Sequence, residues 1–324
     1  MEDSHPVETN DLLEYLAPPK RMVFIVNPKA GTNLQKHIGE AVDKYLNHRR
    51  FVYTIWSTAY PGHGYDLAKK ALEEGFEIVV VVGGDGSVNE IAPALMGTKV
   101  ALGIIPAGSG NGLAMHLGYG RDVSKAVAKL NTAEKHLIDV GLLNKRPFFN
   151  IAGIGFDGFV SNLMKEQTWR GFVPYFLKTM GAGLTYLPLH CRIELDDRVL
   201  NEKCFVIAVA NGPMYGYNMQ IAPDARLDDG LFEVVIIKDV PRWQYFAAVP
   251  STFTGKIYDE AFVEHFTTRH VVISADQPLP VHVDGEGLIS EQMLNFDIQP
   301  GALNVLMPLK ENLYSSVAAR ATVR

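Results

Sequence analysis

The first third of the chain alternates short apolar runs with amphipathic stretches. Four runs rich in β-branched and aromatic residues predict strands, at residues 22–26, 51–56, 77–82 and 101–105. Apolar side chains at helical spacing predict helices near residues 38–46, 65–74, 88–96 and 123–130. The run at 77–82 ends in five consecutive apolar residues, which indicates a strand covered on both faces. This alternation predicts a doubly wound α/β domain.

From about Leu137 onward helical stretches become rare and short strands follow one another. They are predicted at residues 148–152, 192–195, 205–210, 231–237, 270–274 and 280–283. An aromatic-rich segment with helical spacing, residues 166–189, interrupts them. The pattern is typical of a β-rich second domain with antiparallel sheets.

Length and composition support two soluble domains. The chain has 324 residues, of which 47% are hydrophobic and 20% charged, and this is too long for one compact core. We expect an α/β domain over 20–135, with 300–324 packing back onto it, and a second domain over 136–299. Residues 1–19 end in two prolines and are expected to form an extended lead-in.

Charge, cysteines and the N-terminus narrow the choice of partners. Thirty Lys and Arg against 36 Asp and Glu leave a net charge of −6, which argues against nucleic-acid binding. Two cysteines without metal-ligand spacing indicate neither a disulfide framework nor a zinc site. The sequence shows no signal-peptide pattern and no apolar run near the ~20 residues that span a bilayer. We expect a cytoplasmic protein whose membrane contact is peripheral, at the inner face.

Three polar, mostly glycine-rich loops follow predicted strands of the first domain. They are Asn27-Pro28-Lys29-Ala30-Gly31, Gly83-Gly84-Asp85-Gly86-Ser87-Val88-Asn89-Glu90 and Pro106-Ala107-Gly108-Ser109-Gly110-Asn111-Gly112. Glycines let backbone N–H groups approach a ligand, and helix N-termini favour anions. Each loop alone is also compatible with a plain turn, in which Asp85 would be a helix cap. Because parallel strands end at one edge of a sheet, the three loops are expected to form one phosphate-binding crevice.

With these motifs the chain resembles the diacylglycerol kinase catalytic fold, which bacterial lipid kinases share with sphingosine and ceramide kinases. Further matches are Gly153-Ile154-Gly155-Phe156-Asp157, Leu227-Asp228-Asp229-Gly230 and Asp284-Gly285-Glu286. They occur in family order across residues 22–310. The Gly-Gly-Asp-Gly motif alone also occurs in NAD kinases and phosphofructokinases.

The resemblance implies ATP-dependent transfer of a phosphoryl group to a lipid hydroxyl, with nucleotide held between the α/β domain and a β-sandwich-like domain. By that analogy residues of the three loops bind ATP, and Thr58 matches a nucleotide-contacting threonine. The implied ATP-binding residues are Asn27, Gly31, Thr58, Gly83, Gly84, Asp85, Gly86, Ser87, Asn89, Glu90, Gly108, Ser109 and Asn111.

Phosphoryl transfer needs a divalent cation, a positioned γ-phosphoryl group and a base for the substrate hydroxyl. Asp284 is our candidate base, although Asp284-Gly285 is also an ordinary hairpin signal. Glu286 is expected to support it, and Asp85 to bind the catalytic Mg²⁺ directly or through water. Asp157 either joins this acidic cluster or caps a turn.

Two further groups carry paired interpretations. The resemblance implies a second, structural Mg²⁺ bound by the Asp229 carboxylate and the backbone carbonyls of Arg226 and Leu231, and a solvated turn is the alternative. His282 is two residues from Asp284 on a predicted strand, so both side chains face the same way. We therefore single it out among ten scattered histidines.

A lipid substrate needs an apolar site for its tails. The aromatic segments 169–189 and 243–253 could form it, although such stripes more often belong to a core. Where bacterial diacylglycerol kinases commonly have an aspartate, this chain has Gly112, and the stretch resembles sphingosine kinases. We expect a diacylglycerol-like acceptor and keep three alternatives: a sphingoid-base kinase, an NAD kinase-like enzyme and a non-catalytic nucleotide-binding regulator. The sequence leaves a homodimer open.

Overall fold

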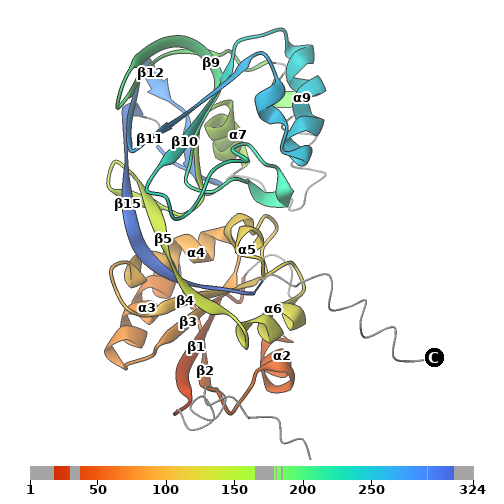
Figure 1. The fold of residues 1–324 in the computed structure, drawn as a ribbon, viewed down its shortest axis with the longest axis vertical. Helices are drawn as coiled ribbons and strands as arrows, with labels where there is room; N and C mark the ends of the chain where they lie inside the picture. The colour runs from red at the N-terminus through yellow and green to blue at the C-terminus, as the bar shows by residue number, and fades with distance from the viewer. Residues whose placement is uncertain are drawn as a thin grey trace, which may run out of the picture.

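Two lobes joined by a pair of long strands make up the molecule (Figure 1). The computed structural model describes residues 18–29, 37–164, 179, 181–183, 185–289 and 291–309. Most of the expected lead-in and residues 310–324 therefore lie outside the described residues. Within the described part, no helix is both long and apolar enough to cross a membrane.

The first lobe is a parallel sheet between helices. Its strands are β1 (Lys20–Val26), β2 (Phe51–Ser57), β3 (Ile78–Gly83) and β4 (Ala101–Pro106), in the order β2-β1-β3-β4. The helices are α2 (Ile38–Tyr45), α3 (His63–Glu73), α4 (Asp85–Ile91), α5 (Gly112–His116) and α6 (Val123–Leu130). All residues of β3 and β4 are buried, which confirms a sheet covered on both faces. The helix after β3 begins at Asp85, earlier than predicted, and a 3₁₀ turn (Ala92–Leu95) continues it.

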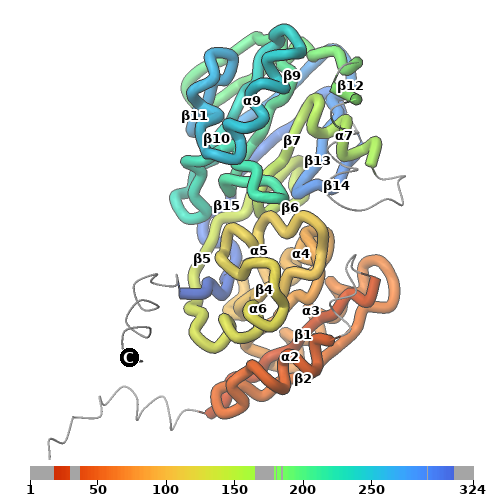
Figure 2. The backbone as a smooth tube through the Cα atoms, turned by 90° about the vertical axis from the view of Figure 1, so that its right-hand side faces the viewer, coloured from red at the N-terminus to blue at the C-terminus, as the bar shows by residue number. Residues whose placement is uncertain are grey.

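Two long antiparallel strands, β5 (Glu134–Leu143) and β15 (Glu291–Met307), run from one lobe into the other (Figure 2). At its end β15 extends the first sheet by pairing in parallel with β4, Val305 opposite Leu102. Its register with β5 shifts between Gln299 and Leu303. The buried Asp139 carboxylate accepts the Gly301 N–H at this bulge and the Gly230 N–H of a neighbouring turn, both at 2.7 Å.

The second lobe is antiparallel, as predicted. Its further strands are β6 (Arg146–Phe148), β7 (Ile151–Gly155), β8 (Leu189–Leu195), β9 (Val199–Ala210), β10 (Phe232–Lys238), β11 (Val263–Thr268), β12 (His270–Leu279), β13 (Val281–Val283) and β14 (Glu286–Gly287). Strand β9 pairs with β7, β8 and β10, and β12 pairs with β15. An apolar core with Phe148, Phe232 and Phe296 fills this lobe.

Three features of the second lobe differ from the sequence expectation. Helix α7 (Phe156–Met164) follows β7 directly, and helix α9 (Arg242–Thr254) carries the second aromatic segment. The strand predicted at 148–152 is interrupted at Phe149 and Asn150. Their backbone N–H groups instead donate to the carboxylate of Asp284.

Candidate active site

The polar loops of the first lobe meet at one sheet edge, the end of the lobe that faces the second lobe (Figures 1 and 2). Asn27 follows β1, and its Nδ2 donates to Ser87 Oγ in α4 at 3.1 Å. Ala107, after β4, donates its N–H to the Gly83 carbonyl at 2.8 Å. The expected convergence of the three strand ends is thus present among the described residues.

Most glycines of these loops are needed for packing. A Cβ on Gly108 would lie 2.5 Å from the Gly84 Cα, so the β3 and β4 loops touch through their backbones. A Cβ on Gly83 would lie 2.4 Å from Ser87 Oγ. At Gly86, which lines the cavity, a Cβ would have no atom within 4 Å. A side chain at Gly83, Gly84 or Gly108 would therefore press against neighbouring protein atoms. At Gly86 the missing side chain leaves space for a ligand instead.

Four implied ATP-binding residues do not line the cavity. Gly83 packs as described, and Thr58 lies after β2 with its N–H donated to the Val26 carbonyl. Glu90 Oε1 accepts from the Gly64 N–H at 2.6 Å, near the start of α3. Asn111 is buried with φ 57°, and its side chain both accepts from and donates to the backbone of Gly108.

Other implied residues do line the cavity, and one lies outside the described part. The cavity-lining group is Asn27, Gly84, Asp85, Gly86, Ser87, Asn89, Gly108, Ser109, Asp284 and Glu286. Gly31 lies outside the described residues. Asn111 and Glu90 therefore hold the loops in shape, while the lining residues face the space where a ligand would bind.

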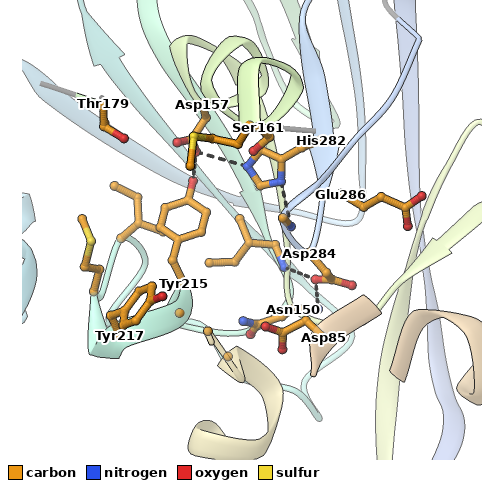
Figure 3. A pocket seen from close by; sticks show the side chains of 18 of the residues that line it. Asp85, Asn150, Asp157, Ser161, Thr179, Tyr215, Tyr217, His282, Asp284 and Glu286 are labelled. Carbon is orange, nitrogen blue, oxygen red and sulfur yellow. Dashed lines mark hydrogen bonds and ion pairs between the residues drawn. The ribbon is translucent and has the colours of Figure 1, made fainter. Parts of the chain in front are cut away.

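Asp284 is fixed from three directions at the tip of the β13–β14 hairpin. Its Oδ1 accepts from the N–H groups of Asn150 (2.9 Å) and Ile151 (3.0 Å), and its Oδ2 accepts from Phe149 (2.9 Å). Its own N–H donates to the Ile151 carbonyl. Both turn residues are left-handed, with φ 47° at Asp284 and 83° at Gly285. The local backbone strain therefore coincides with a carboxylate aimed into the cavity (Figure 3).

Asp85 lies beside Asp284, from the opposite lobe (Figure 3). Burial raises the pKa of Asp85 to about 6, and the charge of Asp284 adds to this rise. Backbone N–H groups at the start of α5, those of Asn111, Gly112 and Leu113, oppose it. Burial also raises the pKa of Asp284, against the effect of its three N–H donors. Two carboxylates whose ionised forms disfavour each other thus face one space.

A second polar cluster lies behind Asp284 and consists of His282, Asp157 and Tyr215. His282 is 3% exposed, and its Nε2 lies 3.5 Å from Asp157 Oδ2. The same oxygen accepts a hydrogen bond from the Tyr215 hydroxyl. Asp157 therefore pairs with a histidine and a tyrosine. Sequence reasoning missed Tyr215, because it stands alone in a loop (Figure 3).

One cavity of about 780 Å³ joins these groups to the interior of the second lobe. Its polar end holds the glycine loops, Asp85 and Asp284. Its apolar end is lined by Phe156, Met164, Phe205, Val206, Ile237, Tyr245, Phe246, Val249, Ile257 and Phe262. Phe205 and Tyr245 stack at 3.9 Å in this part. The size is within the usual range of small-molecule sites.

The two aromatic segments contribute differently to this cavity. From α9, Tyr245 and Phe246 line it, whereas Trp243 and Phe253 are exposed at the surface. The segment at 169–189 lies mostly outside the described residues, although Thr179 and Gly183 line the cavity.

The remaining implied metal and support residues make contacts of their own. Glu286 forms an ion pair with Arg146 at 3.0 Å at the edge of the cavity. The Asp229 carboxylate is exposed and accepts the Leu231 N–H at 3.0 Å, while Arg226 pairs with Asp228. Among the described residues, no group of three or more His, Cys, Asp or Glu side chains is placed to hold a metal ion.

Known families match both lobes. The diacylglycerol kinase catalytic domain matches residues 21–143, and the YegS C-terminal NAD kinase beta sandwich-like domain matches residues 150–307. The protein named "Probable lipid kinase YegS-like" of Chromohalobacter salexigens is 32% identical over 279 residues, covering 84% of this chain and 88% of that protein. The diacylglycerol kinase of Bacillus subtilis is 26% identical over 287 residues, covering 85% and 93%.

A solved structure has the same fold. The crystal structure of a diacylglycerol kinase from Bacillus anthracis aligns with a TM-score of 0.68 at 18% identity, over 90% of this chain and 97% of that one. The predicted fold class, an α/β domain followed by a β-sandwich-like domain, is confirmed. This protein belongs to the family of lipid kinases that combine a diacylglycerol kinase catalytic domain with a YegS-type C-terminal domain.

Proposed function

We propose that this protein transfers the γ-phosphoryl group of ATP to the hydroxyl of a lipid, with diacylglycerol-like lipids as the favoured acceptors. The observation that carries the proposal is the continuous cavity, which joins the glycine loops and Asp284 to an apolar interior. Nucleotide phosphates would bind at its polar end and acyl tails at its apolar end. Membership of the lipid kinase family supports the same assignment.

The nucleotide would bind through the β3 and β4 loops. Gly84, Gly86 and Ser87 provide the approach to its phosphates, and the space above Gly86 is left by a missing side chain. Ser109 lines the same part of the cavity, and Tyr217 of the second lobe lines it as well. Both lobes therefore contact the region where ATP would lie, which would exclude water during transfer.

Asp284 would receive the proton of the acceptor hydroxyl. A base must be held within hydrogen-bond reach of the hydroxyl, and three backbone N–H groups fix this carboxylate. The rise in its pKa brings the group closer to neutral pH, where a base is most effective.

The residues present fit a magnesium ion. Mg²⁺ in phosphoryl-transfer sites is bound by one or two carboxylates together with substrate phosphates. Asp85, whose pKa is raised partly by the charge of Asp284, would gain from a cation beside it. The ion would neutralise charge on the transferring phosphoryl group.

The apolar end of the cavity favours a lipid acceptor over a soluble one. An NAD-like acceptor would leave its polar groups unpaired against Phe205, Val249 and Phe262. A sphingoid base remains the second candidate, because the stretch around Gly112 resembles that of sphingosine kinases and has no aspartate. A Cβ at Gly112 would lie 2.8 Å from Asn150 Nδ2. The space that an aspartate needs there is occupied by Asn150.

The test is transfer of ³²P from [γ-³²P]ATP to mixed micelles of diacylglycerol or sphingosine, with Mg²⁺ or EDTA, and with NAD in a parallel tube. We expect label in diacylglycerol only with Mg²⁺. In Asp284→Asn, turnover should fall by about a hundredfold or more with ATP affinity retained. The matched control is Asp297→Asn, which is exposed on β15 and outside the cavity. Label only in NADP, or equal turnover in Asp284→Asn, would overturn the proposal.

A further inference from the structure

His282 joins the catalytic hairpin to a buried pair behind it. Its Nδ1 accepts the Gly285 N–H at 3.2 Å, and Gly285 directly follows Asp284. Because Nδ1 is the acceptor in this bond, the ring proton lies on Nε2, the atom 3.5 Å from Asp157 Oδ2. Figure 3 shows the ring between the Asp157 carboxylate and the hairpin. Both nitrogens of a buried ring are thus engaged.

The backbone opposite His282 is shaped to admit this pair. His282 is paired across the strands with Gly153 of β7. A Cβ at Gly153 would lie 2.3 Å from His282 Nε2 and 2.5 Å from Asp157 Oδ2. Any other residue at 153 would displace the ring and the carboxylate. The glycine therefore serves the histidine–aspartate contact.

The hairpin needs such support because it is strained. Asp284 is a non-glycine residue with φ 47°, in the left-handed region that side chains other than glycine rarely adopt. The Asp284 N–H is bound by Ile151, and the carboxylate by three N–H groups in front of it. The Gly285 N–H is bound from behind by His282. A small rotation of the turn would move the carboxylate away from its donors.

We propose that His282 is a positioning residue for Asp284, and that Asp157 and Tyr215 hold its ring in place. The chain of contacts runs from the Tyr215 hydroxyl to Asp157, to His282 and to the Gly285 amide. Asp157 acts here as the partner of His282 and not as a member of a metal-binding cluster. The inference rests on the proposed role of Asp284 as the base.

Two substitutions separate the two ends of the ring. In His282→Asn, Oδ1 is attached like Nδ1 and retains an acceptor for Gly285, while the contact with Asp157 is lost. In His282→Gln, the amide reaches as far as Nε2 and retains a donor to Asp157, while the acceptor for Gly285 is lost. His270→Gln is the matched control, since His270 also pairs with an aspartate, Asp297, but is exposed.

We expect kcat to fall about three- to fivefold in His282→Asn and about ten- to a hundredfold in His282→Gln, with KM for ATP unchanged in both. The control should retain full turnover. Equal losses in the two variants, or a loss confined to KM, would overturn the positioning role. If His282→Gln does not fold, Tyr215→Phe is tested in its place, and we expect its kcat to fall about threefold. Full turnover in Tyr215→Phe would refute the chain of contacts.

A second readout does not depend on activity. Hydrogen exchange of the Gly285 amide, followed by NMR on protein labelled with ¹⁵N-glycine, should stay slow in His282→Asn and become at least tenfold faster in His282→Gln. The same exchange rate in both variants would overturn the inference. If the two variants show this pattern but the wild type transfers no phosphate to any lipid, the proposed function fails while the contact stands.

Discussion

Replacing Asp85 with asparagine should stabilise the ligand-free protein and remove its kinase activity. The pKa of Asp85 is raised from 3.8 to about 6 by burial and by Asp284. Each pKa unit corresponds to about 1.4 kcal/mol, so the ionised carboxylate destabilises the fold by about 3 kcal/mol at most. Asp85 is only partly buried, and an asparagine would accept weaker hydrogen bonds than the carboxylate from the N–H groups at the start of α5. Both effects reduce the expected gain in the free energy of unfolding to about 1–2 kcal/mol.

The sign of the effect determines its pH dependence. Between pH 3.8 and about 6 the folded state binds this proton more tightly than the unfolded state. The contribution of Asp85 to the free energy of unfolding therefore becomes less favourable as pH rises through this window, and is fully unfavourable above it. The increase in the free energy of unfolding of Asp85→Asn over the wild type should be present at pH 8 and largely absent at pH 4.

The assay is urea unfolding of the wild type and of Asp85→Asn at both pH values, together with ³²P transfer at pH 8. We expect turnover to fall by about a hundredfold or more, because a group that would bind the cation beside the phosphates is lost. The control is Asp122→Asn, an exposed cap of α6 that accepts the Lys125 N–H at 2.9 Å. An Asp85→Asn protein that is no more stable than the wild type at pH 8 would refute the reasoning.

Three further predictions concern the loops, the apolar end and the join between lobes. Gly86→Ala should leave stability equal or raise it by about 0.5–1 kcal/mol, and should weaken ATP binding about tenfold or more in calorimetry. Unchanged ATP affinity would exclude Gly86 from the site. Val249→Trp should fill the apolar end and lower lipid turnover about tenfold or more at constant ATP affinity, and equal turnover would place the tails elsewhere. Asp139→Ala should lower the free energy of unfolding by about 2–4 kcal/mol in urea, because the Gly230 and Gly301 amides lose their acceptor, and a loss under 1 kcal/mol would contradict this.

Much of the first lobe could be predicted from sequence, because its strands and helices are local patterns. The helix at Val123–Leu130 was predicted to the residue, and Asp122 caps it. The sequence pattern places the start of the helix after β3 three residues late, because Gly86 and Ser87 are typical turn residues. The backbone there is already helical, and Asp85, Gly86 and Ser87 line the cavity from the first turn of α4.

The second lobe and the finer site were harder to predict, because their determinants are distant in sequence. The strand break at Phe149 and Asn150 depends on a carboxylate more than 130 residues away. Asp139 follows a strand pattern, and its partners, Gly230 and Gly301, are backbone amides far along the chain. Glu90 belongs to a motif that implies nucleotide binding, yet its geometry is set by the Gly64 amide. A single sequence contains no signal for such contacts.

The paired strands β5 and β15 have a mechanical consequence. The chain passes between the lobes in these two paired strands, so a change in the angle between the lobes must deform both of them. This arrangement also means that no single cut of the backbone divides the molecule into two complete units. The first-lobe sheet is continued past β4 by a strand from the far end of the chain, where Val305 is paired with Leu102 of β4 on one side and with His136 of β5 on the other.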